Sequence, residues 1–87
     1  MGAYKMAVRK SIHSSQHRQL LALLRQLRTD AGLTQAELAR RIQKDQTFVS
    51  KYESGERRLD VLELREICSA VGITLVEFGR KLERLIS

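Results

Sequence analysis

The sequence predicts an all-α fold of five helices in one compact domain, and three observations lead to this prediction. No stretch alternates polar and apolar residues with the period of two that is typical of strands. Apolar residues instead recur three and four positions apart, which is the spacing of one helix face. Three such stretches are followed by a glycine, the residue that best tolerates the positive φ of a helix C-terminus: Gly32, Gly55 and Gly72.

The first helix is expected over residues 15–31. Its apolar side chains form a single stripe at Leu20, Leu23, Leu24, Leu27 and Ala31. Residues 1–13 show no periodicity and are expected to form a flexible basic arm, so the folded domain is expected to cover residues 14–87.

The second helix is expected to begin at Thr34, because Thr34 and Glu37 can form a capping box in which each side chain accepts from the other residue's backbone amide. It ends near Gln43. The third helix follows Asp45, a favourable N-cap residue, and ends at Ser54. The buried faces of these two helices are expected to consist of Leu38, Ala39, Ile42, Phe48, Val49 and Tyr52.

Two further capping boxes are expected to open the last two helices. Asp60 and Glu63 begin the fourth helix, which ends at a glycine. Thr74 and Glu77 begin the fifth, which runs to about Leu85. The buried face of the fourth helix is expected to consist of Val61, Leu64, Ile67, Cys68 and Val71.

The net charge of +6 comes entirely from the first third of the chain. Six basic residues precede the first acid, Asp30, and the 10 basic residues that follow cancel the 10 acids. A concentration of positive charge on a small domain indicates a polyanionic partner, most often a nucleic acid. The alternative, which charge alone leaves open, is a solvated surface that keeps the protein soluble.

Several classes of protein and site are not expected. The single cysteine, Cys68, excludes an intrachain disulfide framework and a cysteine-rich zinc site. The longest apolar run, from Leu20 to Leu24, is far shorter than the roughly 20 residues that span a bilayer. No pattern indicates a nucleophile with its base, a phosphate-binding loop or a metal cluster. We therefore expect no enzymatic activity, cofactor, metal or small-molecule ligand, and a reducing, cytoplasmic setting.

The second and third helices are separated by only two to three residues, which is the arrangement of a helix-turn-helix. Three segments carry a closer resemblance: Leu33-Thr-Gln-Ala-Glu-Leu-Ala39, Val49-Ser-Lys-Tyr-Glu-Ser-Gly55 and Arg57-Arg-Leu-Asp60. Together with the step from Ala70 to Ile73, they resemble the lambda-repressor/Cro-like (XRE-type) helix-turn-helix family of DNA-binding proteins, over about residues 20–82. The resemblance implies a helix-turn-helix over about residues 34–54.

The resemblance also implies which residues read the bases of DNA. The third helix would lie in the major groove and present Gln46, Thr47, Ser50 and Lys51, whose spacing independently places them on one polar face. Gln46 suits adenine, Lys51 suits guanine or a phosphate, and Thr47 can touch a thymine methyl group. Without the resemblance, a hydrated helix surface is the alternative interpretation of this face.

Residues implied to contact phosphates flank that helix: Gln35, Lys44, Ser54, Arg57 and Arg58. Gln35 lies at the start of the second helix, where backbone amides point at the same phosphate. The two arginines supply forked donors from the loop after the third helix, unless they are simply solvated beside Glu56. Arg28 and Glu53 occupy positions at which the family has an ion pair between the first and third helices.

One departure from the family pattern lies in the turn between the second and third helices. The family has glycine where this chain has Gln43, and an apolar residue where it has Lys44. If Gln43 adopts a positive φ, it costs about 1 kcal/mol relative to glycine. The departure leaves open the angle at which the third helix enters the groove, but not the fold.

The fifth helix carries a heptad-like stripe whose end, at Leu82, Leu85 and Ile86, is expected to contact a second copy of the chain. Folding back onto the first helix is the alternative. With the resemblance, this predicts a transcriptional regulator, more specifically a repressor that binds double-stranded DNA at an inverted repeat as a homodimer. A protein-interaction module, such as an antitoxin that binds a toxin, is the alternative function. The sequence does not choose among phage repressor, antitoxin and restriction–modification controller.

Overall fold

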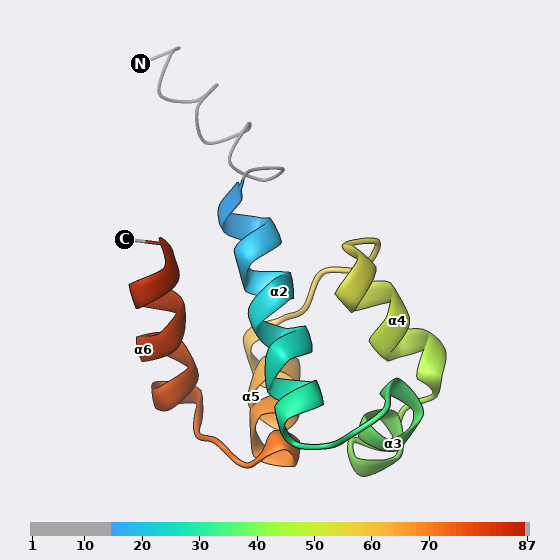
Figure 1. Ribbon diagram of the computed structural model, residues 1–87. Helices are drawn as coiled ribbons and strands as arrows, with labels where there is room; N and C mark the ends of the chain where they lie inside the picture. The colour runs from blue at the N-terminus through green and yellow to red at the C-terminus, as the bar shows by residue number, and fades with distance from the viewer. Residues whose placement is uncertain (1–14, 87) are drawn as a thin grey trace.

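The computed structural model describes residues 15–86, and this part of the chain contains five α-helices and no strand (Figure 1). The helices are α2 (Ser15–Asp30), α3 (Gln35–Arg41), α4 (Gln46–Ser54), α5 (Val61–Val71) and α6 (Leu75–Ile86). The predicted all-α class is confirmed. The basic arm predicted for residues 1–13 lies outside the described residues.

Side chains begin the helices as the sequence predicts. The Thr34 hydroxyl accepts from the Glu37 amide at 3.1 Å, and the Glu37 carboxylate accepts from the Thr34 amide at 2.9 Å. The same reciprocal pairing opens α5 and α6. Asp45 caps α4 by accepting from an amide of its first turn. Because these bonds satisfy amides that the helices leave unpaired, the helix starts are set locally.

α2 lies between α6 on one side and the pair of α3 and α4 on the other (Figure 1). α5 contacts both α3 and α6 and closes the bundle behind α2. This arrangement leaves α4 at the edge of the molecule, with one side in the core and the other side exposed.

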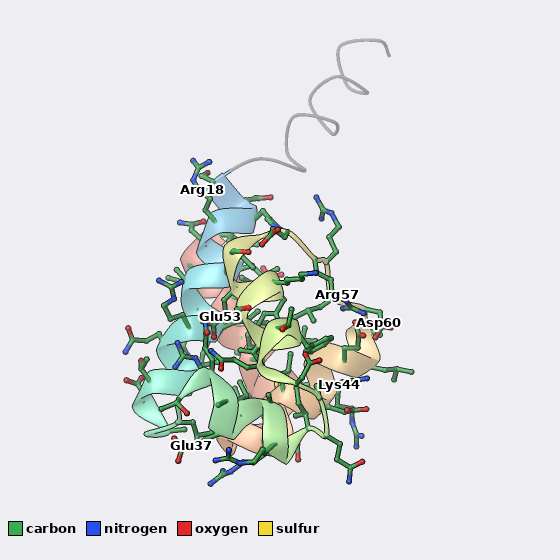
Figure 2. All side chains as sticks on the ribbon, turned by 90° about the vertical axis from the view of Figure 1, so that its right-hand side faces the viewer. Arg18, Glu37, Lys44, Glu53, Arg57 and Asp60 are labelled. Carbon is green, nitrogen blue, oxygen red and sulfur yellow. The ribbon has the colours of Figure 1, made fainter. Side chains whose placement is uncertain are left out.

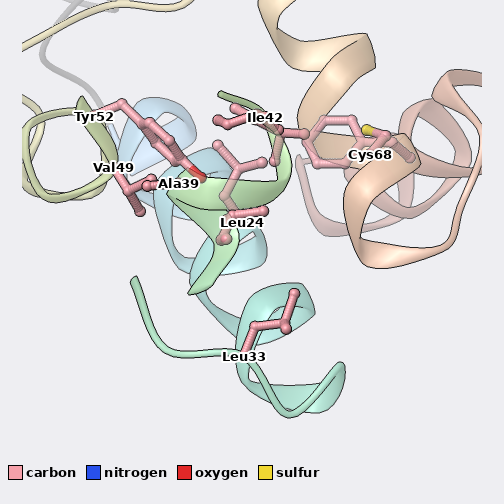
Figure 3. Packing of buried hydrophobic residues seen from close by; sticks show 10 residues of the cluster. Leu24, Leu33, Ala39, Ile42, Val49, Tyr52 and Cys68 are labelled. Atoms are coloured by element: carbon pink, nitrogen blue, oxygen red, sulfur yellow. The ribbon is translucent and has the colours of Figure 1, made fainter. Parts of the chain in front are cut away.

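One apolar core joins all five helices (Figure 3). Ala39 is only 1% exposed, and its small side chain fits the close contact between α3 and α4. The hydroxyl of Tyr52 is buried and has no hydrogen-bond partner among the described residues. Burial raises the pKa of this phenol. The largest fully buried side chains are those of Tyr52, Phe78, Leu24, Leu38, Ile67, Val49 and Cys68.

Two residues that the sequence predicts to be buried are not. Val61 is 62% exposed, because the first turn of α5 extends beyond the core. Ala31 is exposed because α2 ends at Asp30 and the chain turns away at Gly32. Six other predicted core residues are half-buried and pack against the core: Leu20, Leu23, Leu27, Phe48, Leu64 and Val71.

The turn between α3 and α4 closes with a left-handed residue, Gln43, whose φ is 59°. The Gln43 amide donates to the Arg40 carbonyl at 3.1 Å, and the Lys44 amide donates to the Ala39 carbonyl at 2.9 Å. These two bonds form a Schellman motif, the closure that glycines provide at the ends of α2, α4 and α5. Because Ile42 is the C-cap and Gln43 already lies in the left-handed region, α3 ends at Arg41, two residues before the predicted end near Gln43.

A buried ion pair fixes α4 to α2. The Arg28 guanidinium donates to both oxygens of the Glu53 carboxylate, at 2.8 and 3.1 Å, and to the carbonyl of Leu33 at 2.9 Å. The Glu53 side chain is 1% exposed and that of Arg28 is 12% exposed, so the two charges neutralise each other largely out of water. The hydrogen bonds to Glu53 raise the pKa of Arg28. The structure thus contains the ion pair that the family resemblance implies.

Replacing Arg28 with methionine is expected to lower the free energy of unfolding by about 3–5 kcal/mol, because the buried Glu53 carboxylate loses its partner. Chemical denaturation measures this loss. Arg25→Met is the control, since Arg25 is 62% exposed and lies 3.7 Å from the same carboxylate. Arg25→Met should lower the free energy of unfolding by less than about 1 kcal/mol. A loss that small for Arg28→Met would show that its ion pair contributes little to stability. Combining Arg28→Met with Glu53→Leu should recover much of the stability.

Gln43→Gly is expected to raise the free energy of unfolding by about 1 kcal/mol, since glycine adopts a positive φ without steric cost. Thermal denaturation checks this. Gln19→Gly is the matched control, because the same change within α2 should lower the stability by about 1 kcal/mol. A melting temperature that Gln43→Gly leaves unchanged or lowers would argue against strain in the turn.

Candidate DNA-binding surface

The outward face of α4 lies on the side of the molecule that faces the viewer in Figure 2. Gln46, Thr47 and Lys51 are exposed on this helix, and Ser50 is half-buried. The opposite face of α4 lies in the core. The four side chains predicted to read bases therefore share one face of a helix whose rotation is fixed by its buried side.

Two serines of α4 bond to the helix itself. The Ser50 hydroxyl donates to the Thr47 carbonyl at 3.2 Å. The Ser54 hydroxyl lies 3.0 Å from the Lys51 carbonyl and 3.2 Å from the Glu56 carboxylate. Both hydroxyl hydrogens are thus directed toward the protein. The Ser54 oxygen also accepts from the Glu56 amide at 3.4 Å, and each serine oxygen can accept one further bond. For Ser54 to donate to a phosphate, its hydroxyl must rotate away from these acceptors.

Gln35 joins the start of α3 to both ends of α4. Its side-chain amide donates to a Glu53 oxygen at 3.0 Å, and its side-chain oxygen accepts from the Gln46 side chain at 3.4 Å. Gln46 is therefore connected through Gln35 to the buried ion pair. The bond from Gln35 to Glu53 was not predicted from the sequence, because residues 18 positions apart leave no local pattern.

Two cationic side chains, Lys44 and Arg57 (labelled in Figure 2), approach the Phe48 ring of α4. The Arg57 guanidinium lies 4.6 Å from the centre of the ring, and the Lys44 ammonium lies 5.5 Å from it. Arg57 also donates to both oxygens of the Glu63 carboxylate, at 2.8 and 3.0 Å. This pairing raises the pKa of Arg57 and lowers that of Glu63. From the sequence, Glu63 was expected only to cap α5.

Exposed cations surround the outward face of α4. Lys44 precedes the helix, Lys51 lies on it, and Arg58 follows it in the loop that leads to α5. The partial positive charge at the N-terminal end of α4 adds to theirs. A fixed helix that offers amide, hydroxyl and ammonium groups within a rim of cations suits base edges and phosphates together.

The residues predicted to form a dimer contact lie in the second half of α6. Leu82 and Ile86 are half-buried, and Leu82 packs against the core. Leu85 is 46% exposed. Part of the predicted stripe thus covers the core where α6 meets α2, and Leu85 lies on the surface.

Within residues 15–86, none of the helices combines the length and the apolar character that crossing a membrane requires. Among the same residues, histidine, cysteine and acidic side chains form no group of three or more that could hold a metal ion. Cys68 is buried, and burial raises the pKa of its thiol to about 11.

Known proteins resemble this chain in sequence over its central part. A family model described as helix-turn-helix matches residues 24–78. The control protein C.MunI from Mycoplasma sp is 36% identical over 64 residues, which are 74% of this chain and 84% of that relative.

Solved structures share the fold over most of their length. An XRE-family like protein from Pseudomonas syringae pv. tomato str. DC3000 has a TM-score of 0.81 at 42% identity, over 92% of this chain and 98% of its own. The restriction-modification controller protein C.Esp1396I has a TM-score of 0.76 at 27% identity, over 84% of this chain and 92% of its own. The clp gene regulator ClgR from C. glutamicum has a TM-score of 0.70 at 25% identity, over 83% of this chain and 92% of its own.

The match of the family model covers more than half of the chain and includes both helices of the helix-turn-helix. The three segments that carry the sequence resemblance lie within it. The chain therefore belongs to the XRE-type (lambda-repressor/Cro-like) helix-turn-helix family of DNA-binding proteins, and it is a transcription regulator.

Proposed function

We propose that this protein is a repressor that binds an inverted-repeat operator as a homodimer. The observation that carries the proposal is the exposed polar face of α4, held in one direction by the buried pair of Arg28 and Glu53. Such a helix fits the major groove, where each base pair presents a distinct pattern of donors and acceptors. The names of two relatives, a control protein and a restriction-modification controller protein, favour control of restriction–modification genes as its role.

The base contacts in this proposal come from four side chains of α4. The Gln46 amide can donate to adenine N7 and accept from its N6 group, and Lys51 can donate to guanine. Thr47 offers a methyl group to thymine, and Ser50 offers an acceptor oxygen. The Gln46 side chain already donates to the Gln35 side chain in the free protein, so part of the entropy cost of ordering Gln46 is met before DNA binds.

The phosphate contacts are proposed to come from the rim of this face, at Gln35, Lys44, Ser54, Arg57 and Arg58. The two arginines differ in their surroundings. Both are exposed, but the forked face of the Arg57 guanidinium is already occupied by the two Glu63 oxygens. We therefore assign the forked contact with a phosphate to Arg58, and we expect Arg57 to act through its charge and through the loop.

Dimerisation is proposed to involve the end of α6, where Leu85 lies on the surface beside Leu82 and Ile86. Two recognition helices must lie about 34 Å apart to read successive turns of the major groove on one face of the duplex. A symmetric contact between two copies of α6 can set this distance.

Selection of bound duplexes from a random pool, at a stated salt concentration, tests the proposed function. The expected result is the enrichment of one inverted repeat. If no duplex is enriched, the protein is not a sequence-specific DNA-binding protein under those conditions, and the proposal fails.

Gln46→Ala is expected to weaken binding to the enriched duplex by about 1–3 kcal/mol and to relax the base preference at one position of each half-site. Binding to a random-sequence duplex should change little. Gln19→Ala on α2 is the control and should affect neither duplex. Equal losses on both duplexes would place Gln46 at the phosphate backbone instead.

Arg58→Ala is expected to weaken binding to all duplexes alike, because a phosphate contact carries no sequence information. Since a dimer contains two copies, the slope of log Kd against log salt should fall by up to about 2. Arg80→Ala serves as the control: it removes the same charge at an exposed position of α6 and should leave the slope unchanged. An unchanged slope for Arg58→Ala would show that this side chain is directed away from DNA.

Leu85→Asp is expected to shift the sedimenting species from a dimer to a 10.0 kDa monomer and to weaken binding to the enriched duplex. The charge would have to be buried between the two chains. Val76→Asp is the control, because Val76 is also exposed but lies nine residues away, on the opposite side of α6. If the unmodified protein sediments as a monomer at micromolar concentration, α6 does not drive stable dimerisation.

A further inference from the structure

The loop between α4 and α5, residues 55–60, is held at both ends. At its start, two loop amides donate to the Lys51 carbonyl at 2.9 and 3.2 Å. At its end, the Asp60 amide donates to the Glu63 carboxylate at 3.0 Å. The loop that carries Arg58 therefore has a defined backbone rather than a freely moving one.

The Glu63 carboxylate joins this loop to α5. One oxygen accepts from the Asp60 amide and from the Arg57 guanidinium, each at 3.0 Å, and the other oxygen accepts from the same guanidinium at 2.8 Å. Arg57 also donates to the Arg58 carbonyl at 3.0 Å and lies over the Phe48 ring. The Arg57 side chain is 42% exposed and that of Glu63 is 21% exposed, so the pair lies at the surface.

Arg57 thus connects three parts of the structure. It contacts α4 through Phe48, α5 through Glu63 and the loop through the Arg58 carbonyl. A bidentate carboxylate sets the plane of a guanidinium as well as its position. If the carboxylate is lost, Arg57 can leave the Phe48 ring, and the peptide from which the Arg58 side chain extends loses one of its bonds.

We propose that Glu63 is a positioning residue for DNA binding: it holds Arg57 against Phe48 and, through the bond from Arg57 to the Arg58 carbonyl, fixes the backbone from which the Arg58 side chain extends. The inference rests on the proposed function, because it concerns the same surface. An acid beside a DNA-binding surface is otherwise unfavourable, since it repels phosphates. Here Arg57 neutralises that charge at close range, which reduces the repulsion.

The substitution Glu63→Gln distinguishes a positioning role from simple repulsion of DNA, because the two roles predict opposite changes in Kd. Glutamine has nearly the same size, and it also completes a capping box, so the start of α5 is preserved. The variant loses the negative charge that holds Arg57. If Glu63 only repels DNA, the variant binds more tightly and with a steeper salt dependence. If Glu63 positions the loop, the variant binds more weakly although its net charge is more positive.

Fluorescence anisotropy with the duplex enriched in the selection provides the test, at a temperature well below the melting temperature of every variant. Glu63→Gln is expected to raise Kd by about three- to tenfold, the effect of losing one modest ion pair in each of two subunits. Glu66→Gln is the matched control, because it makes the same change of charge at an exposed acid one turn further along α5. It should leave Kd unchanged or lower it slightly.

A double variant completes the experiment. Since Glu63 acts through Arg57, Glu63→Gln should no longer raise Kd when it is added to a protein that already carries Arg57→Gln. A Glu63→Gln protein that binds as tightly as the parent, or more tightly, overturns the positioning role and leaves the proposed function intact. If the parent enriches and binds no duplex, the proposed function fails and the positioning role fails with it.

Discussion

The arrangement of α2, α3 and α4 depends on the carboxylate of Glu53, which lies on α4 and is 1% exposed. Its oxygens accept from Arg28 on α2 and from Gln35 on α3, so one buried charge joins three helices. A buried carboxylate is tolerated only while its hydrogen-bond partners are in place. A rotation of α4 that removed these partners would leave the buried charge unpaired, so the pairing favours the orientation in which the polar face of α4 points outward.

A second constraint comes from the backbone. Four helices end in the same Schellman closure, and three of them use glycine while α3 uses Gln43. The turn between α3 and α4 thus keeps its hydrogen bonds although the residue is unfavourable there. The next residue, Lys44, lies near the face of Phe48, where an ammonium group is attracted by the ring. Both departures from the family pattern are therefore compatible with a regular helix-turn-helix.

Helix positions and starts were predictable because apolar spacing and capping residues act locally. The pair of Arg28 and Glu53, 25 residues apart, was predictable only through the family resemblance. Spacing also indicated which side chains share the outward face of α4. Spacing did not show that Val61 lies outside the core. Periodicity identifies which face of a helix is apolar, but not how far along the helix that face is covered by other elements. The bond of Arg57 to Glu63 depends on how the loop meets α5, which local patterns do not encode.

Tyr52 gives the folded state an optical signature. The chain contains no tryptophan and two tyrosines. The phenol of Tyr52 is fully buried, and burial raises its pKa, so the phenolate is disfavoured while the core is closed. The phenolate absorbs ultraviolet light at a longer wavelength than the phenol. The delayed appearance of its absorbance at alkaline pH therefore reports the opening of the core at the residue next to Glu53, without any added label.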